Sequence, residues 1–506
     1  MPPYLLGIDV GTGGAKALVV DTAGNVIASA TEEYPLHTPR PLWSEQNPQD
    51  WWDACQRAVG RVLASGVAAA DIAGVGLTGQ MHGLVLLDKS GAILRPAILW
   101  NDQRTGRQCE EITARAGGLD RLLALTGNAI LPGFTAPKIV WVAEHEPDVY
   151  ARVAHVLLPK DYIRYRLTGE FATEVSDASG TSLFDVANRR WSAEMAGLLH
   201  VPLSWLPVCT ESDVVSGRIS AAAAAATGLR AGTPVVGGGG DQAAQAVGSG
   251  IVRSGIISVT SGTSGVIFAH ADHFAAEPQG RLHVFCHAVP GAWHAMGVML
   301  SAGGAFRWFR DALGQLEKVA AAETGADPYD LLTQAAARVP AGAEGLLFLP
   351  YLTGERCPHP DPHARGAFVG LTLRHAKRHL ARAVLEGVSF GLRDSLEMIH
   401  GLGAPIEQVR ASGGGARSPL WRQIQADVFG VELALINVTE GAAFGVALLA
   451  GVGAGLYGDI HEAVAAAVRV VSSTQPDPAA VAVYERLYPS YRALYAALKP
   501  TFDALA

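Results

Sequence analysis

Gly237-Gly238-Gly239-Gly240-Asp241-Gln242 is the stretch from which the fold of this chain can be worked out. A β-rich run, Thr233 to Val236, comes before the four glycines, and a helix-prone run, Ala243 to Val247, follows the acid. Glycines at the end of a strand let a ligand approach the bare backbone, and the N-terminus of the next helix favours an anion. The stretch predicts a strand, a turn and a helix with Asp241 beside a bound anion. An ordinary tight turn is the alternative.

Two matching turns lie on either side of this stretch. One reads Val10-Gly11-Thr12-Gly13-Gly14-Ala15, and the other reads Ser261-Gly262-Thr263-Ser264-Gly265-Val266. Each joins two β-like runs, residues 5–10 and 15–21 in the first half and residues 255–260 and 265–270 in the second. This internal repeat indicates a duplicated fold, and glycine N–H groups with a threonine hydroxyl can bind an oxyanion. Two such turns could hold a polyphosphate from both sides; two ordinary hairpins are the alternative.

The remaining pattern alternates strands and helices. The first half continues with a strand at 26–33, a helix at 50–64 and a buried strand at 72–77. The second half has strands near 293–300 and 346–351, a helix at 379–400, a strand at 408–411 and a helix at 419–429. This order predicts an α/β fold that is not a simple β-α-β repeat. The uncharged run at 441–458 is shorter than the ~20 residues of a membrane span and is predicted to be a buried helix.

Composition narrows the class of protein. The chain has 506 residues, more than one hydrophobic core usually supports, so two domains are expected. It is 49% hydrophobic and 17% charged, as in folded rather than disordered proteins. A formal net charge of −8 without any block of Lys and Arg argues against a nucleic-acid surface. Five scattered cysteines, without a CxxC motif or an export signal, predict a reduced cytoplasmic protein with no membrane segment.

Three further stretches contain residues with potential chemistry. The run Ser412-Gly413-Gly414-Gly415-Ala416-Arg417-Ser418 lacks the spacing of a dinucleotide fingerprint and suits a nucleoside lying against the backbone. A cluster that could suggest zinc falls in strand-like segments whose alternate residues face opposite ways, and it comprises His283, Cys286, His287 and His294. The run Glu355-Arg356-Cys357-Pro358-His359 is predicted to be a polar loop near a cleft rather than a reactive thiol.

On these motifs the chain resembles the FGGY carbohydrate kinases of the actin/hexokinase/Hsp70 superfamily, over essentially its whole length. Residues 7–12 and 262–264 resemble the two phosphate motifs of that superfamily. Gly133-Phe134-Thr135-Ala136-Pro137-Lys138-Ile139-Val140-Trp141 is similar to one family signature, and residues 366–371 with 379–386 are similar to the other. Residues 43–48, 79–83, 100–102 and 158–162 resemble the xylulokinase branch. Gly13 departs from that branch, in which Ser is common.

The resemblance implies two actin-like (ribonuclease H-like) domains, each a mixed β-sheet flanked by helices, with the active-site cleft between them. We expect residues 1–247 to bind the sugar and to carry the first phosphate motif and the catalytic acid, and residues 248–506 to bind the nucleotide. The implied reaction is transfer of a phosphoryl group from ATP, with Mg²⁺, to the 5-hydroxyl of D-xylulose, giving D-xylulose 5-phosphate and ADP. Such a reaction needs mainly positioning and charge neutralisation, which two anion-binding turns and a helix N-terminus can supply.

The resemblance also implies roles for single residues. Asp241 is expected to be the general base, and Asp9 is expected to bind the magnesium ion through water. The sugar is expected to contact Met81, His82, Asp241 and Gln242, the last of which is often Asn in xylulokinases. The ATP is expected to contact Gly11, Thr12, Gly13, Gly262, Thr263, Gly303, Arg307, Gly414, Gly415 and Ser418.

Other functions stay open at this point. Another FGGY kinase, acting on ribulose, ribitol, gluconate or glycerol, would share these motifs. A duplicated nucleotide clamp could also drive an actin-like or Hsp70-like switch, although no appended β-domain or helical lid is visible. A dehydrogenase is disfavoured because the dinucleotide fingerprint fails. The aromatic and leucine face of residues 481–498 predicts an internal core, with a homodimer contact as the alternative.

Overall fold

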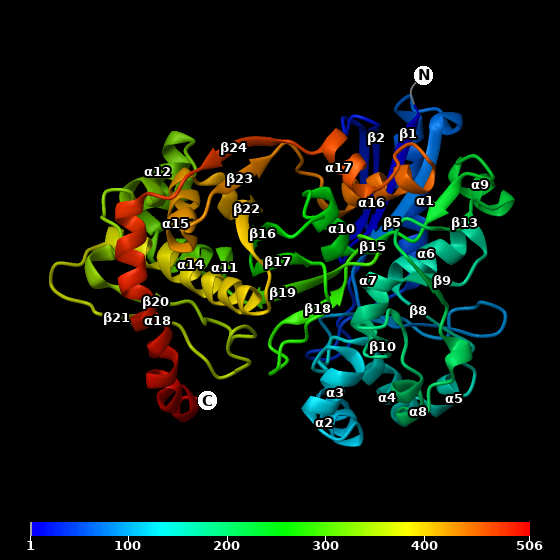
Figure 1. The fold of residues 1–506 in the computed structure, drawn as a ribbon, viewed down its shortest axis with the longest axis horizontal. Helices are drawn as coiled ribbons and strands as arrows, with labels where there is room; N and C mark the ends of the chain where they lie inside the picture. Colours follow the sequence, from blue (N-terminus) through cyan, green and yellow to red (C-terminus); the bar gives the residue numbers. More distant parts are fainter. Residues whose placement is uncertain (1–2) are drawn as a thin grey trace.

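The computed structural model describes residues 3–506 and has two lobes, each built on a mixed seven-stranded sheet (Figure 1). In the first sheet β1 (Tyr4–Val10), β2 (Gly14–Asp21) and β3 (Val26–Glu33) form an antiparallel meander. Next to β1, β5 (Ile72–Gly79) and then β14 (Pro234–Val236) add in parallel, and β13 (Val215–Arg218) closes that edge. The short strand β15 (Gly239–Gly240) also pairs with β5.

The second sheet repeats this topology. Its meander consists of β16 (Gly255–Ser261), β17 (Gly265–Ala271) and β19 (Trp293–Met299). Two parallel strands follow β16, namely β22 (Ile406–Ser412) and β23 (Leu433–Ile436), and the edges are β18 (His283–Cys286) and β24 (Val470–Thr474). The duplication predicted from the two Gly-Thr turns is therefore confirmed, because each turn joins the first two strands of one meander.

One predicted strand lies outside this sheet. The run at 346–351 forms β20 (Leu347–Leu349), which pairs with β21 (Ala367–Val369) from the second family signature. This ribbon lies directly on α14 (Lys377–Gly401), where a Cβ atom on Gly387 would come within 2.1 Å of the Phe348 carbonyl oxygen. Gly387, directly after the second signature, lets helix and ribbon meet at backbone distance.

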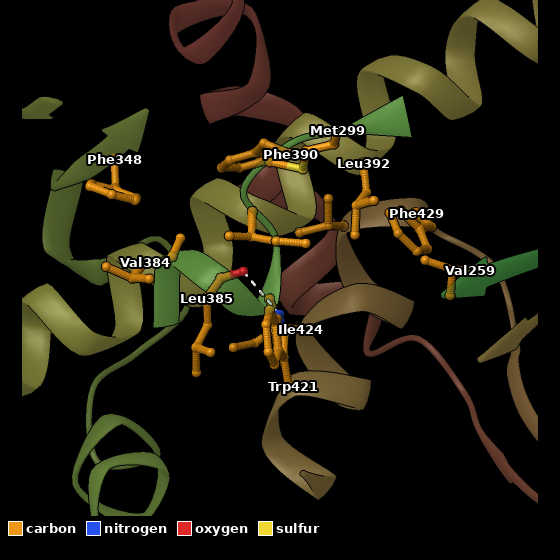
Figure 2. Close-up of a cluster of buried hydrophobic side chains, with 14 of the residues drawn as sticks. Val259, Met299, Phe348, Val384, Leu385, Phe390, Leu392, Trp421, Ile424 and Phe429 are labelled. Carbon is orange, nitrogen blue, oxygen red and sulfur yellow. Dashed lines mark hydrogen bonds between the residues drawn. The ribbon is translucent and has the colours of Figure 1, made fainter. Parts of the chain in front are cut away.

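Helices complete each lobe. The first sheet is covered by α1 (Pro48–Ala64), whose Trp51 is fully buried. The second is covered by α14, α11 (Gly303–Leu313), α15 (Pro419–Phe429) and the C-terminal α18 (Pro478–Ala504). Figure 2 shows Val259 and Met299 of this sheet with Leu385 of α14 and Trp421 of α15, whose Nε1 donates to the Leu385 carbonyl at 3.2 Å. The predicted helices at 50–64, 379–400 and 419–429 are confirmed.

The apolar face of α18 packs inward. Tyr484 and Tyr491 are buried in the core of the second lobe, and Leu487 and Leu494 pack against the same core. The prediction of an internal core for residues 481–498 is confirmed, whereas the alternative of a homodimer contact remains a prediction.

Between the lobes lie two helices, α10 (Asp241–Gly248) and α16 (Gly441–Gly453), each of which follows a parallel strand of one repeat. Although α16 belongs to the second half of the chain, it packs on the first sheet beside β1 and β5, with α17 (Ile460–Ala467) nearby (orange against blue in Figure 1). Cβ atoms on Gly7 and Gly76 would lie 1.9 Å from carbonyl oxygens of α16. The predicted buried helix is confirmed, and none of the helices in residues 3–506 has the length and apolar character needed to cross a membrane.

The first lobe also contains the short β4 (Glu45–Gln46), α9 (Ala221–Thr227) between β13 and β14, and a long segment inserted between β5 and β13. In chain order this inserted segment contains β6 (Val85–Leu87), β7 (Ala97–Ile98), α2 (Gly106–Arg115), α3 (Leu119–Thr126), α4 (Thr135–His145), α5 (Pro147–Tyr150), β8 (His155–Leu157), α6 (Pro159–Thr168), β9 (Ala172–Glu174), α7 (Val175–Ala178), β10 (Phe184–Asp185), β11 (Arg190–Trp191), α8 (Ala193–Leu198) and β12 (Val208–Thr210). The second lobe adds α12 (Gln315–Thr324) and α13 (Pro328–Ala336).

Candidate active site

Two carboxylates lie near each other at one end of the first sheet. Asp9 lies near the end of β1, and Asp241 opens α10 directly after Gly240, which lies in register with Gly79 of β5 and through it with Val10 of β1. Burial, and then the nearby Asp9 carboxylate, raise the pKa of Asp241 to about 7. Burial also raises the pKa of Asp9 to about 6, against the opposing effect of Lys16. The two acids therefore form a pair of elevated proton affinity.

The glycine run fits closely against the first sheet. Gly238 has a φ of +72°, and a Cβ atom there would lie 1.9 Å from the Leu77 carbonyl oxygen. A Cβ atom on Gly237 would lie 2.4 Å from the Glu211 carbonyl oxygen. At these two positions the glycines are required by the protein's own backbone, so the run predicted as a ligand turn is first of all a packing device that brings Asp241 to the end of the sheet.

Buried side chains of α6 and α7 form hydrogen bonds with the glycine run. Arg164 on α6 donates to the carbonyl oxygens of Val236 at 2.7 Å and Gly237 at 2.5 Å, and the N–H of Gly240 donates to Ser176 Oγ at 3.0 Å. Glu174 in turn accepts from the Ser176 hydroxyl at 3.0 Å. Both Arg164 and Glu174 are fully buried. Sequence reasoning missed this support; the signal available was a set of charged residues inside an otherwise apolar segment.

The first Gly-Thr turn is a tight hairpin. The N–H of Gly11 donates to the Gly14 carbonyl at 3.0 Å. The Thr12 hydroxyl is already bonded within the protein, because it donates to Gln80 Oε1 at 3.1 Å and accepts from Trp100 Nε1 at 3.0 Å. Gly13 is exposed, and a Cβ atom there would meet nothing within 4 Å. The turn therefore leaves position 13 exposed and open to an added side chain.

The second Gly-Thr turn forms part of a cavity of about 400 Å³. The N–H groups of Gly303 and Gly304, at the start of α11, donate to the carbonyl oxygens of Gly262 (2.7 Å) and Thr263 (3.0 Å). Seven residues predicted to contact ATP line this one cavity, namely Gly262, Thr263, Gly303, Arg307, Gly414, Gly415 and Ser418. The structure thus brings together segments that are about 150 residues apart in the sequence, at a volume typical of small-molecule sites.

The same cavity has a wall that sequence reasoning missed. Tyr329, Asp330 and Thr333 of α13 and its N-cap residue Asp327 also line it, together with Phe306 and Trp421. The only local signal was Asp327-Pro328, a helix start in which Asp327 accepts from the Tyr329 N–H at 2.8 Å. Such a start marks a helix and says nothing of a ligand, so this wall could not be foreseen.

The predicted sugar residues lie next to Asp241. Met81 is buried, with its side chain 3.0 Å from the position of a Cβ atom on Gly240. His82 has a φ of +67°, stacks on Phe134 at 4.6 Å and makes a 2.8 Å contact from Nδ1 to the Gly180 carbonyl oxygen. Burial, and then Lys138, lower the pKa of His82 to about 3, so its ring is neutral. Since Nδ1 must donate to a carbonyl, Nε2 carries a free lone pair.

Gln242 follows Asp241 in the first turn of α10, and its backbone and side-chain N–H groups act to lower the pKa of the Asp241 carboxyl. Across the cleft, β18 of the second lobe brings Phe285 within 6.2 Å of the His82 ring. Residues of both lobes therefore meet at the position predicted to bind the sugar.

The residues that could suggest zinc lie on or beside two paired strands. His283 and Cys286 are in β18, and His287 follows it. His294 is in β19, with its ring 5.6 Å from that of His287 and stacked on Phe268 at 4.2 Å. In residues 3–506 no group of three or more His, Cys, Asp or Glu side chains is arranged to hold a metal ion. A site for Mg²⁺ needs only one or two carboxylates, and Asp9 Oδ1 is buried without a hydrogen-bond partner among those residues. That orphaned oxygen, beside a second acid, fits a hard cation.

The loop at 355–359 packs under the second lobe's turn. Glu355 Oε1 accepts from the N–H groups of Leu300 at 2.8 Å and Arg356 at 2.7 Å. Burial raises the pKa of the Cys357 thiol to about 12, so the thiol stays protonated. This agrees with a structural loop rather than a reactive thiol.

Comparison with known proteins gives one consistent result. Models of the N-terminal and C-terminal domains of the FGGY family of carbohydrate kinases match residues 4–248 and 257–454. The chain is 42% identical to the xylulose kinase of Escherichia coli (strain K12) over 98% of this chain and 99% of that protein. It is 38% identical to the xylulose kinase of Bacillus subtilis (strain 168) over 99% and 98%. The crystal structure of xylulose kinase from Rhodospirillum rubrum superposes with a TM-score of 0.91, at 35% identity over 99% of this chain and all of that one.

Proposed function

The chain belongs to the FGGY family of carbohydrate kinases, and from that membership we infer that it is a xylulose kinase. It transfers the terminal phosphoryl group of ATP to the 5-hydroxyl of D-xylulose and releases D-xylulose 5-phosphate and ADP. The observation that carries this conclusion is the similarity to several xylulose kinases over nearly the whole length of both chains. The predicted architecture of two mixed sheets flanked by helices is confirmed by the same comparison.

Asp241 acts as the general base in this proposal. As the sugar oxygen bonds to phosphorus, the bond between phosphorus and the bridging oxygen of ADP breaks, and the hydroxyl proton moves to the carboxylate. A carboxyl group with a pKa of about 7 holds that proton better than an ordinary aspartate, which supports the role. General-base assistance contributes typically ~10²–10⁴-fold to a rate.

Asp9 is the proposed partner of Mg²⁺, through water, and its orphaned Oδ1 supports this assignment. When bound, the ion neutralises negative charge on the phosphates. The phosphates are assigned to the backbone of the two Gly-Thr turns, with Gly11, Thr12 and Gly13 on one side and Gly262 and Thr263 on the other. The nucleoside is assigned to the cavity of about 400 Å³, where Gly303, Arg307, Gly414, Gly415 and Ser418 also lie.

The sugar is assigned to the space beside Met81, His82, Asp241 and Gln242. D-Xylulose is neutral, so hydrogen bonds rather than charge must recognise it. A neutral imidazole with a free Nε2 lone pair, as the pKa and the Nδ1 contact of His82 indicate, suits a hydroxyl donor.

Wider properties remain proposals. We assign sugar binding to residues 1–247 and nucleotide binding to residues 248–506, with the qualification that α16 packs on the first sheet. All five cysteines are free thiols, which supports a reducing compartment such as the cytoplasm. A homodimer is retained as the proposed alternative to a monomer.

The decisive experiment is a panel of sugars in a coupled ADP-release assay, run with wild type and Asp241→Asn side by side. We expect D-xylulose to give the highest kcat/KM among xylulose, ribulose, ribitol, gluconate and glycerol. Asp241→Asn should lose sugar-dependent turnover while still binding xylulose. Near-wild-type turnover in that variant would contradict the base assignment, and a different preferred sugar would contradict the substrate.

An ATP-driven switch of the actin or Hsp70 kind is the alternative from another class. Such a protein hydrolyses ATP in response to a partner rather than to a sugar. Strong stimulation of ADP release by xylulose alone excludes it.

A further inference from the structure

The backbone carbonyl of His82 is held by two side chains from α4. Lys138 Nζ donates to it at 2.8 Å and to the Gly133 carbonyl at 2.7 Å. The Thr135 hydroxyl donates to the same His82 oxygen at 3.1 Å. Both side chains are fully buried. The N-terminal part of α4, which belongs to the first family signature, therefore fixes the backbone of His82, next to Met81 in the proposed sugar site.

Lys138 is an unusual choice for such a buried place. Its two hydrogen bonds go to neutral carbonyl groups, and it forms no ion pair within residues 3–506. Burial lowers the pKa of its ammonium group to about 7, against the weaker effect of Asp102. A buried amino group without a carboxylate partner is costly to the folded state, so an apolar residue would serve better if stability alone mattered.

The conformation of His82 explains the effect of these hydrogen bonds to its carbonyl group. A non-glycine residue at a φ of +67° is strained, and it persists only where its surroundings fix it. The ring is fixed as well, by the Nδ1 contact to Gly180 and by stacking on Phe134, which immediately precedes α4. The segment 134–138 thus holds both the backbone and the ring of His82, and Nε2 is left unbonded for a ligand.

We propose that Lys138 is a positioning residue for the sugar, which holds the His82 carbonyl so that Nε2 faces a hydroxyl group of the substrate as an acceptor. This inference rests on the proposed function, because it concerns the polyol site of the same reaction. Lys138 itself does not touch the sugar. Its effect is on the selection of a substrate that carries a hydroxyl at the matching position.

The first test is Lys138→Met, which keeps the length of the side chain and removes its donors. The KM for xylulose should rise by roughly tenfold to a hundredfold, because a loosened carbonyl frees the ring to turn. The KM for ATP, sugar-independent ATP hydrolysis and kcat at saturating xylulose should change much less, since the nucleotide cavity lies in the other lobe. A folded Lys138→Met protein with the wild-type KM for xylulose would overturn the proposal, as would an equal rise in both KM values.

Two milder variants keep the test decisive if Lys138→Met fails to fold. Thr135→Val removes one donor from the same carbonyl and should raise the KM for xylulose by roughly threefold to tenfold. Gly180→Ala places a Cβ atom 2.4 Å from His82 Nδ1 and should raise it by displacing the ring directly. If Gly180→Ala acts on the KM for xylulose but Thr135→Val does not, the ring matters and the carbonyl grip does not, and the proposal is wrong.

The matched control is Thr227→Val. Thr227 is also a buried threonine whose hydroxyl donates to a backbone carbonyl, that of Ala223 in α9, at 2.7 Å. It should leave both KM values unchanged, and a rise in the KM for xylulose there would show that lost stability alone mimics the effect. If wild type prefers another polyol of the sugar panel, the variants are measured on that polyol, so failure of the substrate assignment stays separate from failure of the positioning role.

Discussion

At the scale of single residues, the raised pKa of Asp241 beside Asp9 suits the proposed general base but lowers the stability of the folded protein at higher pH. The pKa of Asp241 rises from 3.8 to about 7 on folding, so the folded protein binds the extra proton more tightly than the unfolded chain. Its ionisation therefore lowers the free energy of unfolding as the pH rises from about 4 through 7. The raised pKa of Asp241 therefore lowers the free energy of unfolding of the ligand-free protein above neutral pH.

The pair leads to a prediction about Asp241→Asn. This neutral variant should unfold at a higher temperature than wild type at pH 8, and the difference should shrink at pH 5, where most Asp241 in the folded wild type is protonated. Thermal unfolding without nucleotide and with a chelator present measures it. Equal unfolding temperatures at pH 8 would show that ionisation of Asp241 does not lower the free energy of unfolding, which contradicts the prediction.

Gly13 supplies a second prediction at this scale. Gly13→Ser should fold normally, because the added Cβ meets nothing within 4 Å and position 13 does not have a positive φ. If the first turn holds phosphate, the new hydroxyl should lower the KM for ATP by roughly threefold to tenfold without changing the KM for xylulose. Steady-state kinetics with each substrate varied in turn provide the measurement. An unchanged KM for ATP would place the phosphates away from position 13.

At the scale of elements, α10 and α16 join the two halves of the chain at backbone distance. A Cβ atom on Gly445 of α16 would lie 1.9 Å from the Ala244 carbonyl oxygen in α10. Backbone atoms on both sides leave nothing flexible to move aside. Because Asp241 opens α10, any shift of this helix also moves the proposed general base.

A pair of matched glycine substitutions tests this joint. Gly445→Ala should lower the free energy of unfolding by ~1–3 kcal/mol or more and reduce kcat, because overpacking pushes the helices apart. Gly60→Ala, in the exposed part of α1 with nothing within 4 Å, should instead raise it by ~0.5–1 kcal/mol. Chemical denaturation of both variants gives the comparison. A harmless Gly445→Ala would mean that the helices can separate without loss.

Whether a feature could be predicted from the sequence depends on how far apart in the chain its interacting residues lie. The Gly-Thr turns, the meanders and the long helix at 379–400 depend on local periodicity and turn chemistry, so they were predicted correctly. The hydrogen bonds from Lys138 to His82 and from Arg164 to the glycine run join residues more than 50 positions apart, so no local sequence pattern could predict them. The contribution of α13 to the cavity of about 400 Å³ was missed for the same reason. The residues predicted to bind ATP came from motif resemblance, and their meeting in one cavity depends on the tertiary fold.

At the scale of the whole molecule, we expect the two lobes to move relative to each other when the substrates bind. Lys16 of β2 forms an ion pair with Glu440, just before α16, and Arg410 of β22 donates to the Ser249 carbonyl at 2.7 Å. These contacts join the lobes at the level of the two middle helices, so motion about them would open or close the cleft. Closure on both substrates would exclude water from the transferring phosphoryl group.

Lobe closure predicts a smaller radius of gyration in the presence of xylulose and a non-hydrolysable ATP analogue than in the free protein. It also predicts slow ATP hydrolysis without sugar, because the open cleft positions water poorly. Small-angle X-ray scattering and a sugar-free ADP-release assay measure the two effects. Identical scattering profiles with fast sugar-free hydrolysis would contradict closure.

The placement of α16 has a consequence for how the protein is made. The inner face of the first sheet, with Leu5 and Leu18, is completed by residues such as Ala443 and Leu448. At ~5–20 residues per second, the ribosome needs roughly 20 to 90 s to travel from the one set to the other. During that interval the nascent first lobe lacks α16 on this apolar face, and we expect a chaperone or a temporary contact to shield it. The lobe that is synthesised first is thus among the last parts of the molecule to finish folding.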